Sequence, residues 1–217
     1  MGREEETAPR RGYETLIGAQ ALAENIHRQD WVVVDCRFDL ADTDTGEHAY
    51  RQSHIPGARY AHLDRDLSGP VTAATGRHPL PDSEGFARWL GAQGMHNGSQ
   101  VVAYDDLGGS MAVRLWWLMR WLGHRRVAVL DGGFQAWRDA GLMLTADVPD
   151  PKPAVFKGMA DDSMVVEADA LMEEKAGRVL IDVRTAERFR GEVEPIDPVA
   201  GRIPGAVNVP WPDNLGP

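Results

Sequence analysis

The sequence contains very little cysteine and no long apolar segment. Its single cysteine, Cys36, excludes an internal disulfide framework and fits a reducing compartment. No apolar run approaches the roughly 18 residues that a membrane-spanning helix requires. The first six residues, Met-Gly-Arg-Glu-Glu-Glu, also lack the apolar segment of a secretory signal. We therefore expect a cytoplasmic protein that makes no contact with a membrane.

Basic residues are outnumbered by acidic ones, 23 to 33, which gives a formal net charge of −10 at pH 7. An acidic surface repels phosphate backbones and anionic lipids, so the composition disfavours nucleic-acid binding. The seven histidines show no pairing at metal-ligand spacing, and we expect neither a metal site nor a cofactor. The remaining composition, 43% hydrophobic and 26% charged, is sufficient for a sizeable globular core.

Two motifs occur twice in the chain, in the same order. Residues 32–37 (Val-Val-Val-Asp-Cys-Arg) correspond to residues 179–184 (Val-Leu-Ile-Asp-Val-Arg). Residues 54–60 (His-Ile-Pro-Gly-Ala-Arg-Tyr) correspond to residues 202–208 (Arg-Ile-Pro-Gly-Ala-Val-Asn). The two motifs are 20 residues apart in the first copy and 21 in the second, and the copies are offset by 147 residues. Ordered motifs at matched spacing indicate tandem domains.

A proline-rich segment separates the two copies. Three of the seven residues in 147–153 are proline, which fixes φ and donates no backbone hydrogen bond, so this segment is typical of an extended linker. We predict a first domain at residues 1–146, a linker at 147–153 and part of a second domain at 154–217.

Within the first copy, short apolar runs alternate with helical patterns. The apolar runs, which read as buried strands, are 32–34, 58–60, 101–104 and 127–130. A first helical pattern, capped by Ser83, runs through Phe86, Trp89 and Leu90 and ends before Gly94. Two more cover residues 112–122 and 134–140. This alternation predicts an α/β fold, a parallel sheet covered by helices on both faces.

The second copy is shorter than the first. In the first copy the third predicted strand ends at Asp105, 70 residues after Asp35, and the equivalent position in the second copy would be near 252, beyond Pro217. We therefore expect one complete domain and only the opening part of a second. An incomplete sheet exposes apolar surface and unpaired backbone. Residues after about 155 should be loosely held, docked on the first domain, or completed by self-association with another chain.

A glycine-rich loop follows the predicted strand 101–104. In residues 104–111 (Tyr-Asp-Asp-Leu-Gly-Gly-Ser-Met) the glycines allow successive backbone N–H groups to surround an anion at the start of the next helix. A cysteine thiolate would suit this position as a nucleophile. The sequence has Asp105 there, and we predict a carboxylate hydrogen-bonded by the loop amides. Cys36 lies outside any such loop, and we predict that it is a buried, inert thiol.

Together these motifs resemble the tandem rhodanese (sulfurtransferase) family, over essentially the whole chain after about Thr15. The resemblance rests on the repeated Asp-x-Arg and Ile-Pro-Gly-Ala motifs, the loop 104–111, and residues 130–137 (Leu-Asp-Gly-Gly-Phe-Gln-Ala-Trp). It implies two domains, each with a five-stranded parallel sheet flanked by helices. It also implies a non-catalytic first domain, commonly with aspartate at the position of Asp105, and a catalytic cysteine in the second. That cysteine accepts sulfur from thiosulfate or 3-mercaptopyruvate as a persulfide and passes it to cyanide or another thiophilic acceptor.

The resemblance also indicates residues that bind the anionic sulfur donor. Residues 187–191 (Glu-Arg-Phe-Arg-Gly) resemble the family segment whose first arginine binds the donor, which corresponds to Arg188, and Arg190 is a weaker candidate. Residues 76–81 resemble the first-domain loop that reaches toward the second-domain site, which makes His78 a candidate. The sequence departs from the family at Arg202, where histidine is usual. No catalytic residue is predicted within the chain.

Our hypothesis is a sulfurtransferase of the tandem rhodanese type whose nucleophilic cysteine is absent from these 217 residues, so that the chain alone is inactive. The alternative is a non-catalytic rhodanese-like binding or regulatory module, which Asp105 favours for the first domain. A phosphatase of related fold would need a loop cysteine followed by an arginine, and residues 105–111 contain neither.

Overall fold

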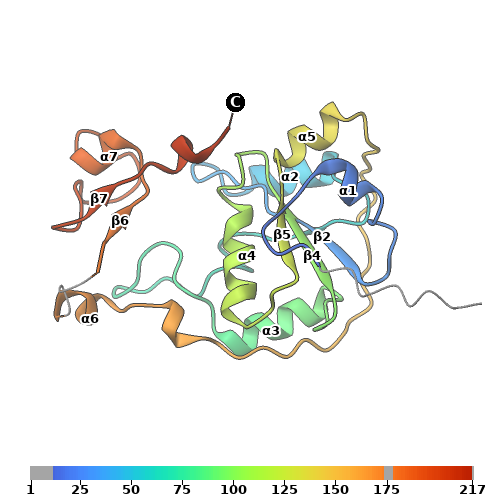
Figure 1. Cartoon of the computed structure of the whole chain (residues 1–217), viewed down its shortest axis with the longest axis horizontal. Helices are drawn as coiled ribbons and strands as arrows, with labels where there is room; N and C mark the ends of the chain where they lie inside the picture. Colours follow the sequence, from blue (N-terminus) through green and yellow to red (C-terminus); the bar gives the residue numbers. More distant parts are fainter. Residues whose placement is uncertain (1–11, 174–177, 217) are drawn as a thin grey trace, which may run out of the picture. The chain divides into compact units, whose positions relative to one another are not determined.

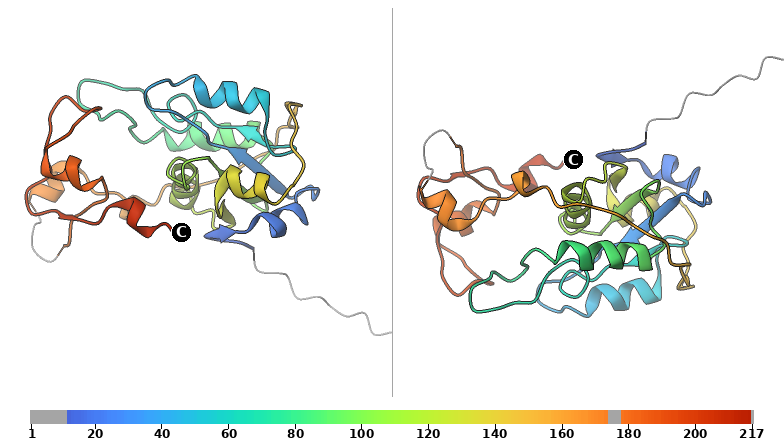
Figure 2. Two further views of the ribbon diagram at one scale, coloured as in Figure 1. Left: turned by 90° about the horizontal axis from the view of Figure 1, so that it is seen from above. Right: turned by 90° about the horizontal axis from the view of Figure 1, so that it is seen from below.

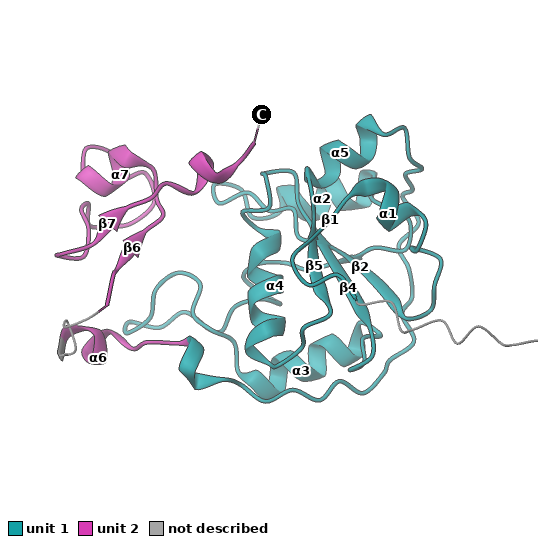
Figure 3. Ribbon diagram, viewed as in Figure 1, with its two compact units in different colours: residues 1–164 teal, residues 165–217 magenta. Residues whose placement is uncertain are grey.

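The computed structural model describes residues 12–173 and 178–216, which belong to two compact units (Figure 3). Unit 1 is Met1–Met164 and unit 2 is Val165–Pro217. Residues 1–6, from which we expect no targeting signal, lie outside the described residues. Among the described residues, no helix has the length and apolar character needed to cross a lipid bilayer.

Unit 1 contains a five-stranded, fully parallel sheet with the strand order β1-β5-β4-β2-β3. The strands are β1 (Leu16–Ile17), β2 (Trp31–Asp35), β3 (Arg59–Tyr60), β4 (Gln100–Tyr104) and β5 (Val127–Leu130). All residues of β2, β4 and β5 are buried, as expected for strands covered on both faces. The sheet predicted from sequence is confirmed, except that the short edge strand β1 was not predicted.

Helices cover both faces of this sheet (Figures 1 and 2). They are α1 (Ala19–Ala23), α2 (Thr45–Gln52), α3 (Ser83–Ala92), α4 (Ala112–Trp121) and α5 (Gly133–Asp139). Helices α1, α2 and α5 contribute Leu22, Tyr50 and Phe134 to one core cluster with the sheet, and α3 and α4 lie on the opposite face. One prediction is corrected: the N-cap of α3 is Asp82, whose carboxylate accepts from the Gly85 N–H, and Ser83 is already helical.

The chain remains in contact with unit 1 beyond the proline-rich segment. The Ala154 N–H donates to the Gly91 carbonyl at 2.8 Å, the Phe156 side chain is buried, and the Asp161 N–H donates to the Trp121 carbonyl at 2.9 Å. A 3-10 turn, η1 (Asp162–Met164), ends the unit. Residues 154–164 therefore pack on unit 1 and belong to its fold.

Unit 2 repeats the opening of unit 1. It contains α6 (Ala168–Glu173), β6 (Ile181–Asp182), α7 (Ala186–Arg190), β7 (Val207–Asn208) and η2 (Trp211–Asn214). Strand β7 pairs in parallel with β6, with Ile181 opposite Val207 and Asp182 opposite Asn208. The equivalent pairs in unit 1 join Val34 to Arg59 and Asp35 to Tyr60, so the two repeats have the same register.

Candidate functional site

The carboxyl end of β4 carries Asp105 inside a ring of backbone N–H groups. Its Oδ1 accepts from Leu107 at 2.9 Å and Gly109 at 2.8 Å, and its Oδ2 accepts from Met111 at 2.7 Å and Ala112 at 2.8 Å. The side chain is fully buried. The last two donors lie at the N-terminus of α4, where helix N–H groups have no intrahelical partner.

This ring is an anion-binding cradle whose ligand is the chain's own carboxylate. Gly133 allows α5 to approach it closely, because a Cβ at this position would lie 2.4 Å from the Asp105 carbonyl oxygen. The Phe134 N–H donates to that same oxygen at 2.8 Å. The prediction that loop amides bind the Asp105 carboxylate is confirmed. Because Asp105 has no sulfur, the cradle of unit 1 has no persulfide-forming group.

A buried polar cluster lies at the ends of the adjacent strands. Arg37 donates to both carboxylate oxygens of Asp35 and, at 2.7 Å, to the Ser53 carbonyl. The Tyr104 hydroxyl donates to Asp35 Oδ2 at 2.7 Å, and the Arg37 guanidinium lies 4.2 Å from the ring centroid of Phe134. The Asp-x-Arg pair is therefore a fork that joins the end of β2 to the end of α2, where Ser53 is the C-cap residue. Tyr104 and Phe134 were not predicted as partners of Asp35 and Arg37, because neither residue lies in one of the repeated motifs.

The same fork occurs in unit 2. Arg184 donates to both carboxylate oxygens of Asp182, the shortest contact being 2.6 Å, and also to the Gly201 carbonyl at 2.6 Å. Gly201 occupies the position of Ser53 in the repeat, two residues before the isoleucine of the Ile-Pro-Gly-Ala motif. The fork is thus a structural element of each repeat.

Cys36 is buried immediately after β2. Burial raises the pKa of its thiol well above the usual value, and the carboxylates of Asp35, Asp105 and Asp66 raise it further. The thiolate, which is the reactive form, is therefore strongly disfavoured. The predicted burial of Cys36 is confirmed, and the inertness of its thiol stays a prediction.

His78 lies in unit 1, on the segment between β3 and α3. Its Nε2 is 3.6 Å from Asp64 Oδ1, and its ring meets Phe38 edge-on at a centroid distance of 6.5 Å. Burial lowers the pKa of His78 and the positive charges of Arg114 and Arg77 lower it too, while Asp64 opposes them. His78 is therefore biased toward the neutral imidazole.

Arg188 and Arg190 lie on α7 in unit 2. Arg188 donates to Glu194 at 2.7 Å and to Asp197 at 2.9 Å, and it lowers the pKa of Glu194 to about 2. Arg190 is exposed and pairs with Glu192 at 2.7 Å. The predicted donor-binding residues are thus divided between the two units, and both arginines are engaged by carboxylates of their own unit.

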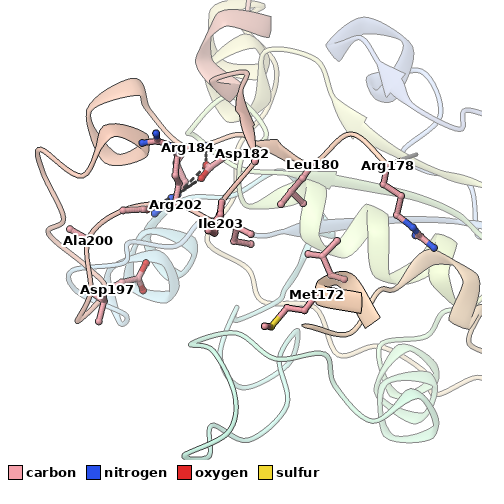
Figure 4. A pocket seen from close by; sticks show the side chains of 14 residues that line it. Met172, Arg178, Leu180, Asp182, Arg184, Asp197, Ala200, Arg202 and Ile203 are labelled. Atoms are coloured by element: carbon pink, nitrogen blue, oxygen red, sulfur yellow. Dashed lines mark hydrogen bonds and ion pairs between the residues drawn. The ribbon is translucent and has the colours of Figure 1, made fainter. Parts of the chain in front are cut away.

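Unit 2 also contains a hollow of about 820 Å³ (Figure 4). Its lining includes Leu180, the Asp182–Arg184 pair and Ile203. The positions of Leu180 and Ile203 in the repeat correspond to Val33 and Ile55, which are 3% and 0% exposed in the core of unit 1. Ile203, by contrast, is 55% exposed. Residues that line this hollow therefore hold repeat positions that belong to the core in unit 1.

The sheet order, the helices on both faces and an anion cradle at the carboxyl end of a central strand define an α/β domain built around an anion-binding loop. The model of the rhodanese-like domain matches residues 18–140. A relative from Pseudomonas aeruginosa, named "Probable 3-mercaptopyruvate sulfurtransferase", is 50% identical over 205 residues, covering 93% of this chain and 72% of the relative. The chain belongs to the rhodanese-like sulfurtransferase family.

Two further similarities agree with this family. The "Thiosulfate sulfurtransferase" of Bos taurus is 32% identical over 212 residues, covering 92% of this chain and 70% of the relative. The crystal structure of the 3-mercaptopyruvate sulfotransferase SseA from Escherichia coli has a TM-score of 0.81 at 29% identity, covering 94% of this chain and 78% of that one. The resemblance to rhodaneses predicted from sequence is confirmed.

Proposed function

We propose that this chain belongs to a sulfurtransferase that moves sulfane sulfur through a cysteine persulfide, and that the nucleophilic cysteine is not among its 217 residues. The donor is thiosulfate or 3-mercaptopyruvate, and the acceptor is cyanide or another thiophile. With thiosulfate, a thiolate takes the outer sulfur and releases sulfite. Cyanide then takes that sulfur from the persulfide, which regenerates the thiolate and forms thiocyanate. The similarity to sulfurtransferases named for either donor supports the chemistry and leaves the donor open.

The observation that carries the proposal of an inactive chain is that Asp105 fills the cradle in which a thiolate would sit. The single cysteine, Cys36, is in addition buried with a raised pKa. Neither position can form an exposed thiolate. In this proposal Arg188 orients the donor anion, which requires the donor to replace Glu194 or Asp197 as its partner. His78 and Arg190 are the further candidate residues for contact with the donor.

The test is formation of thiocyanate from thiosulfate and cyanide, and of pyruvate from 3-mercaptopyruvate, by homogeneous chain. We expect no activity above the blank, and no mass increase of one sulfur atom on the chain. A Cys36→Ser variant is the matched control, because it contains no thiol. Turnover that the chain supports and the Cys36→Ser variant loses would identify Cys36 as the nucleophile and overturn the proposal.

The sequence places the start of the second domain at residue 154, but residues 154–164 pack on unit 1. We further propose that the remainder of this segment, unit 2 (residues 165–217), is the opening of a second domain of the same fold, and that it self-associates when uncompleted. In unit 1, β2 lies between β3 and β4, whereas β6 has only β7 as a partner among the described residues. Val179, Ile181 and Val183 are each more than half exposed. Backbone amides of residues 179–183 should therefore exchange with solvent rapidly in dilute solution and more slowly at high concentration. Uniformly slow exchange at every concentration would contradict this.

A non-catalytic binding module is the second candidate, and the filled Asp105 cradle favours it for unit 1. A longer form of the protein that contains a second cradle loop would decide between the two. Sulfur transfer by that form supports the sulfurtransferase, whereas retention of a protein partner through unit 1 without sulfur transfer supports the module.

A further inference from the structure

An exposed arm, residues 68–78, projects from unit 1 between β3 and α3 (Figure 1). Residues 70–77 are all exposed, and the tip is a compact turn in which the Thr72 N–H donates to Thr75 Oγ1 at 2.8 Å. The two ends of the arm meet where the Gly69 N–H donates to the Pro79 carbonyl at 3.0 Å. The arm is therefore a closed loop, and its direction depends on how its base is held.

The base is held by Arg114, which lies in the first turn of α4. Arg114 Nε donates to the Leu67 carbonyl at 3.1 Å, at the start of the arm. A terminal nitrogen of the same guanidinium donates to the carbonyls of His78 at 3.1 Å and Pro79 at 2.9 Å, at its end. One planar group thus joins both ends of the arm to a helix, which is a geometry that the guanidinium fork supports and a lysine ammonium does not reproduce.

The contacts of Arg114 are unusual for a charged group. Burial lowers the pKa of Arg114, and no carboxylate pairs with it among the described residues. Its charge is therefore balanced by three carbonyl dipoles. Burying a cation costs free energy, which these charge-assisted hydrogen bonds offset, and the same bonds order the chain around the guanidinium. The same helix supplies the Ala112 N–H to the Asp105 cradle, so α4 links the arm to the cradle loop.

We propose that Arg114 is the positioning residue of the arm: it closes the arm's base and fixes where His78 is presented. Only the substrate-side role of His78 rests on the proposed function, and the anchoring stands without it. Sequence reasoning gave no signal for this residue, since Arg114 belongs to none of the repeated motifs.

Limited trypsin digestion of the full chain tests the anchoring at the Arg77–His78 bond. Arg114→Gln should be cut there at least about tenfold faster than the wild type, the change in local opening expected when a charge-assisted hydrogen bond is lost. Arg114→Lys should fall between the two. Arg120→Gln is the matched control, because Arg120 lies on the same helix and stacks on Trp116, and it should be cut at the wild-type rate. Equal cleavage of the wild type and Arg114→Gln would overturn the proposal.

The imidazole of His78 provides a second readout that a general loss of stability would not move. Its NMR titration should shift to higher pH in Arg114→Gln, because the nearby charge and the burial are both reduced, and should shift less in Arg114→Lys. An unchanged titration in Arg114→Gln would also count against the proposal.

The wild type provides a third test if the variants do not fold. The Arg114 Nε–H proton should exchange with water at least about tenfold more slowly than that of Arg120, since it is buried in a hydrogen bond. Equal exchange rates would refute the anchoring. None of these measurements involves sulfur chemistry, so their failure and that of the proposed function are separate results.

Discussion

Replacing Asp105 with asparagine should destabilise unit 1 more than any conservative change at an exposed carboxylate. The wild-type side chain accepts four backbone N–H bonds, two on each oxygen. Asparagine has only one carbonyl oxygen, and its amide N–H₂ would face the other pair of donors. The substitution therefore leaves two backbone donors without an acceptor and removes a negative charge from the start of α4.

The size of the effect depends on which pair loses its acceptor. Ala112 is buried, whereas Leu107 is exposed and Gly109 is partly exposed, so we expect the N–H groups of Leu107 and Gly109 to be the easier pair to hydrate. We expect the asparagine oxygen to face Met111 and Ala112, so that the two orphaned donors are those of Leu107 and Gly109. An orphaned buried donor costs about 1–3 kcal/mol, and partial hydration places the total at about 2–3 kcal/mol.

The assay is urea unfolding followed by tryptophan fluorescence, which reports mainly on unit 1 because six of the seven tryptophans lie there. Asp106→Asn is the matched control: Asp106 is the next residue and is exposed, and its substitution should change the free energy of unfolding by less than about 0.5 kcal/mol. A loss below about 1 kcal/mol for Asp105→Asn would refute the argument that the carboxylate holds the cradle together.

Three further predictions concern unit 1. Tyr104→Phe removes the hydroxyl that donates to Asp35 at 2.7 Å, and should lower the free energy of unfolding by about 1.5–2 kcal/mol; a neutral effect in urea unfolding would contradict the cluster. Bonds from Arg65 and Arg51 lower the pKa of Glu47 from 4.5 to about 2. The ionised Glu47 side chain therefore stabilises the fold fully above pH 4.5, and this contribution is lost as the pH falls to 2. The free energy of unfolding of Glu47→Gln should fall less steeply than that of the wild type between these pH values. Parallel pH profiles of the two proteins would exclude this contribution. Cys36 should resist a thiol reagent in the native chain and react once urea unfolds it, and rapid native labelling would refute its burial.

The central strands of unit 1 could be predicted because tertiary structure reinforces their local pattern. Residues 32–34, 101–104 and 127–130 are apolar runs without alternation, which is typical of strands buried on both faces, and β2, β4 and β5 lie at these positions. Strand β1 has only two residues and pairs with β5 at the edge of the sheet, so it has no pattern of its own. Its formation depends on the neighbouring strand, which the local sequence does not reveal.

The cradle was predictable for a different reason. A strand, an acidic residue and two glycines before a helix contain all the atoms that form it, within residues 104–112. Arg114 and Tyr104 were not predictable as site residues, because their partners lie 35 or more residues away in the chain. Contacts of that length depend on the packing of α4 and β4, and a single sequence contains no record of them.

The comparison between the repeats gives the strongest support to the proposal that unit 2 is the first part of a second domain. The fork of Asp182 and Arg184 has the bonds of its unit 1 counterpart, down to the carbonyl that precedes the Ile-Pro-Gly-Ala motif. In unit 1, however, Tyr104 also donates to Asp35, and the ring of Phe134 lies against the Arg37 guanidinium. Among the described residues of unit 2 no side chain performs either role. A buried fork is stable only when its remaining polar atoms are satisfied and its surface is covered. If unit 2 is the opening of a second domain, as proposed above, we expect an aromatic hydroxyl from a neighbouring strand and a ring from a following helix to cover this partly exposed fork.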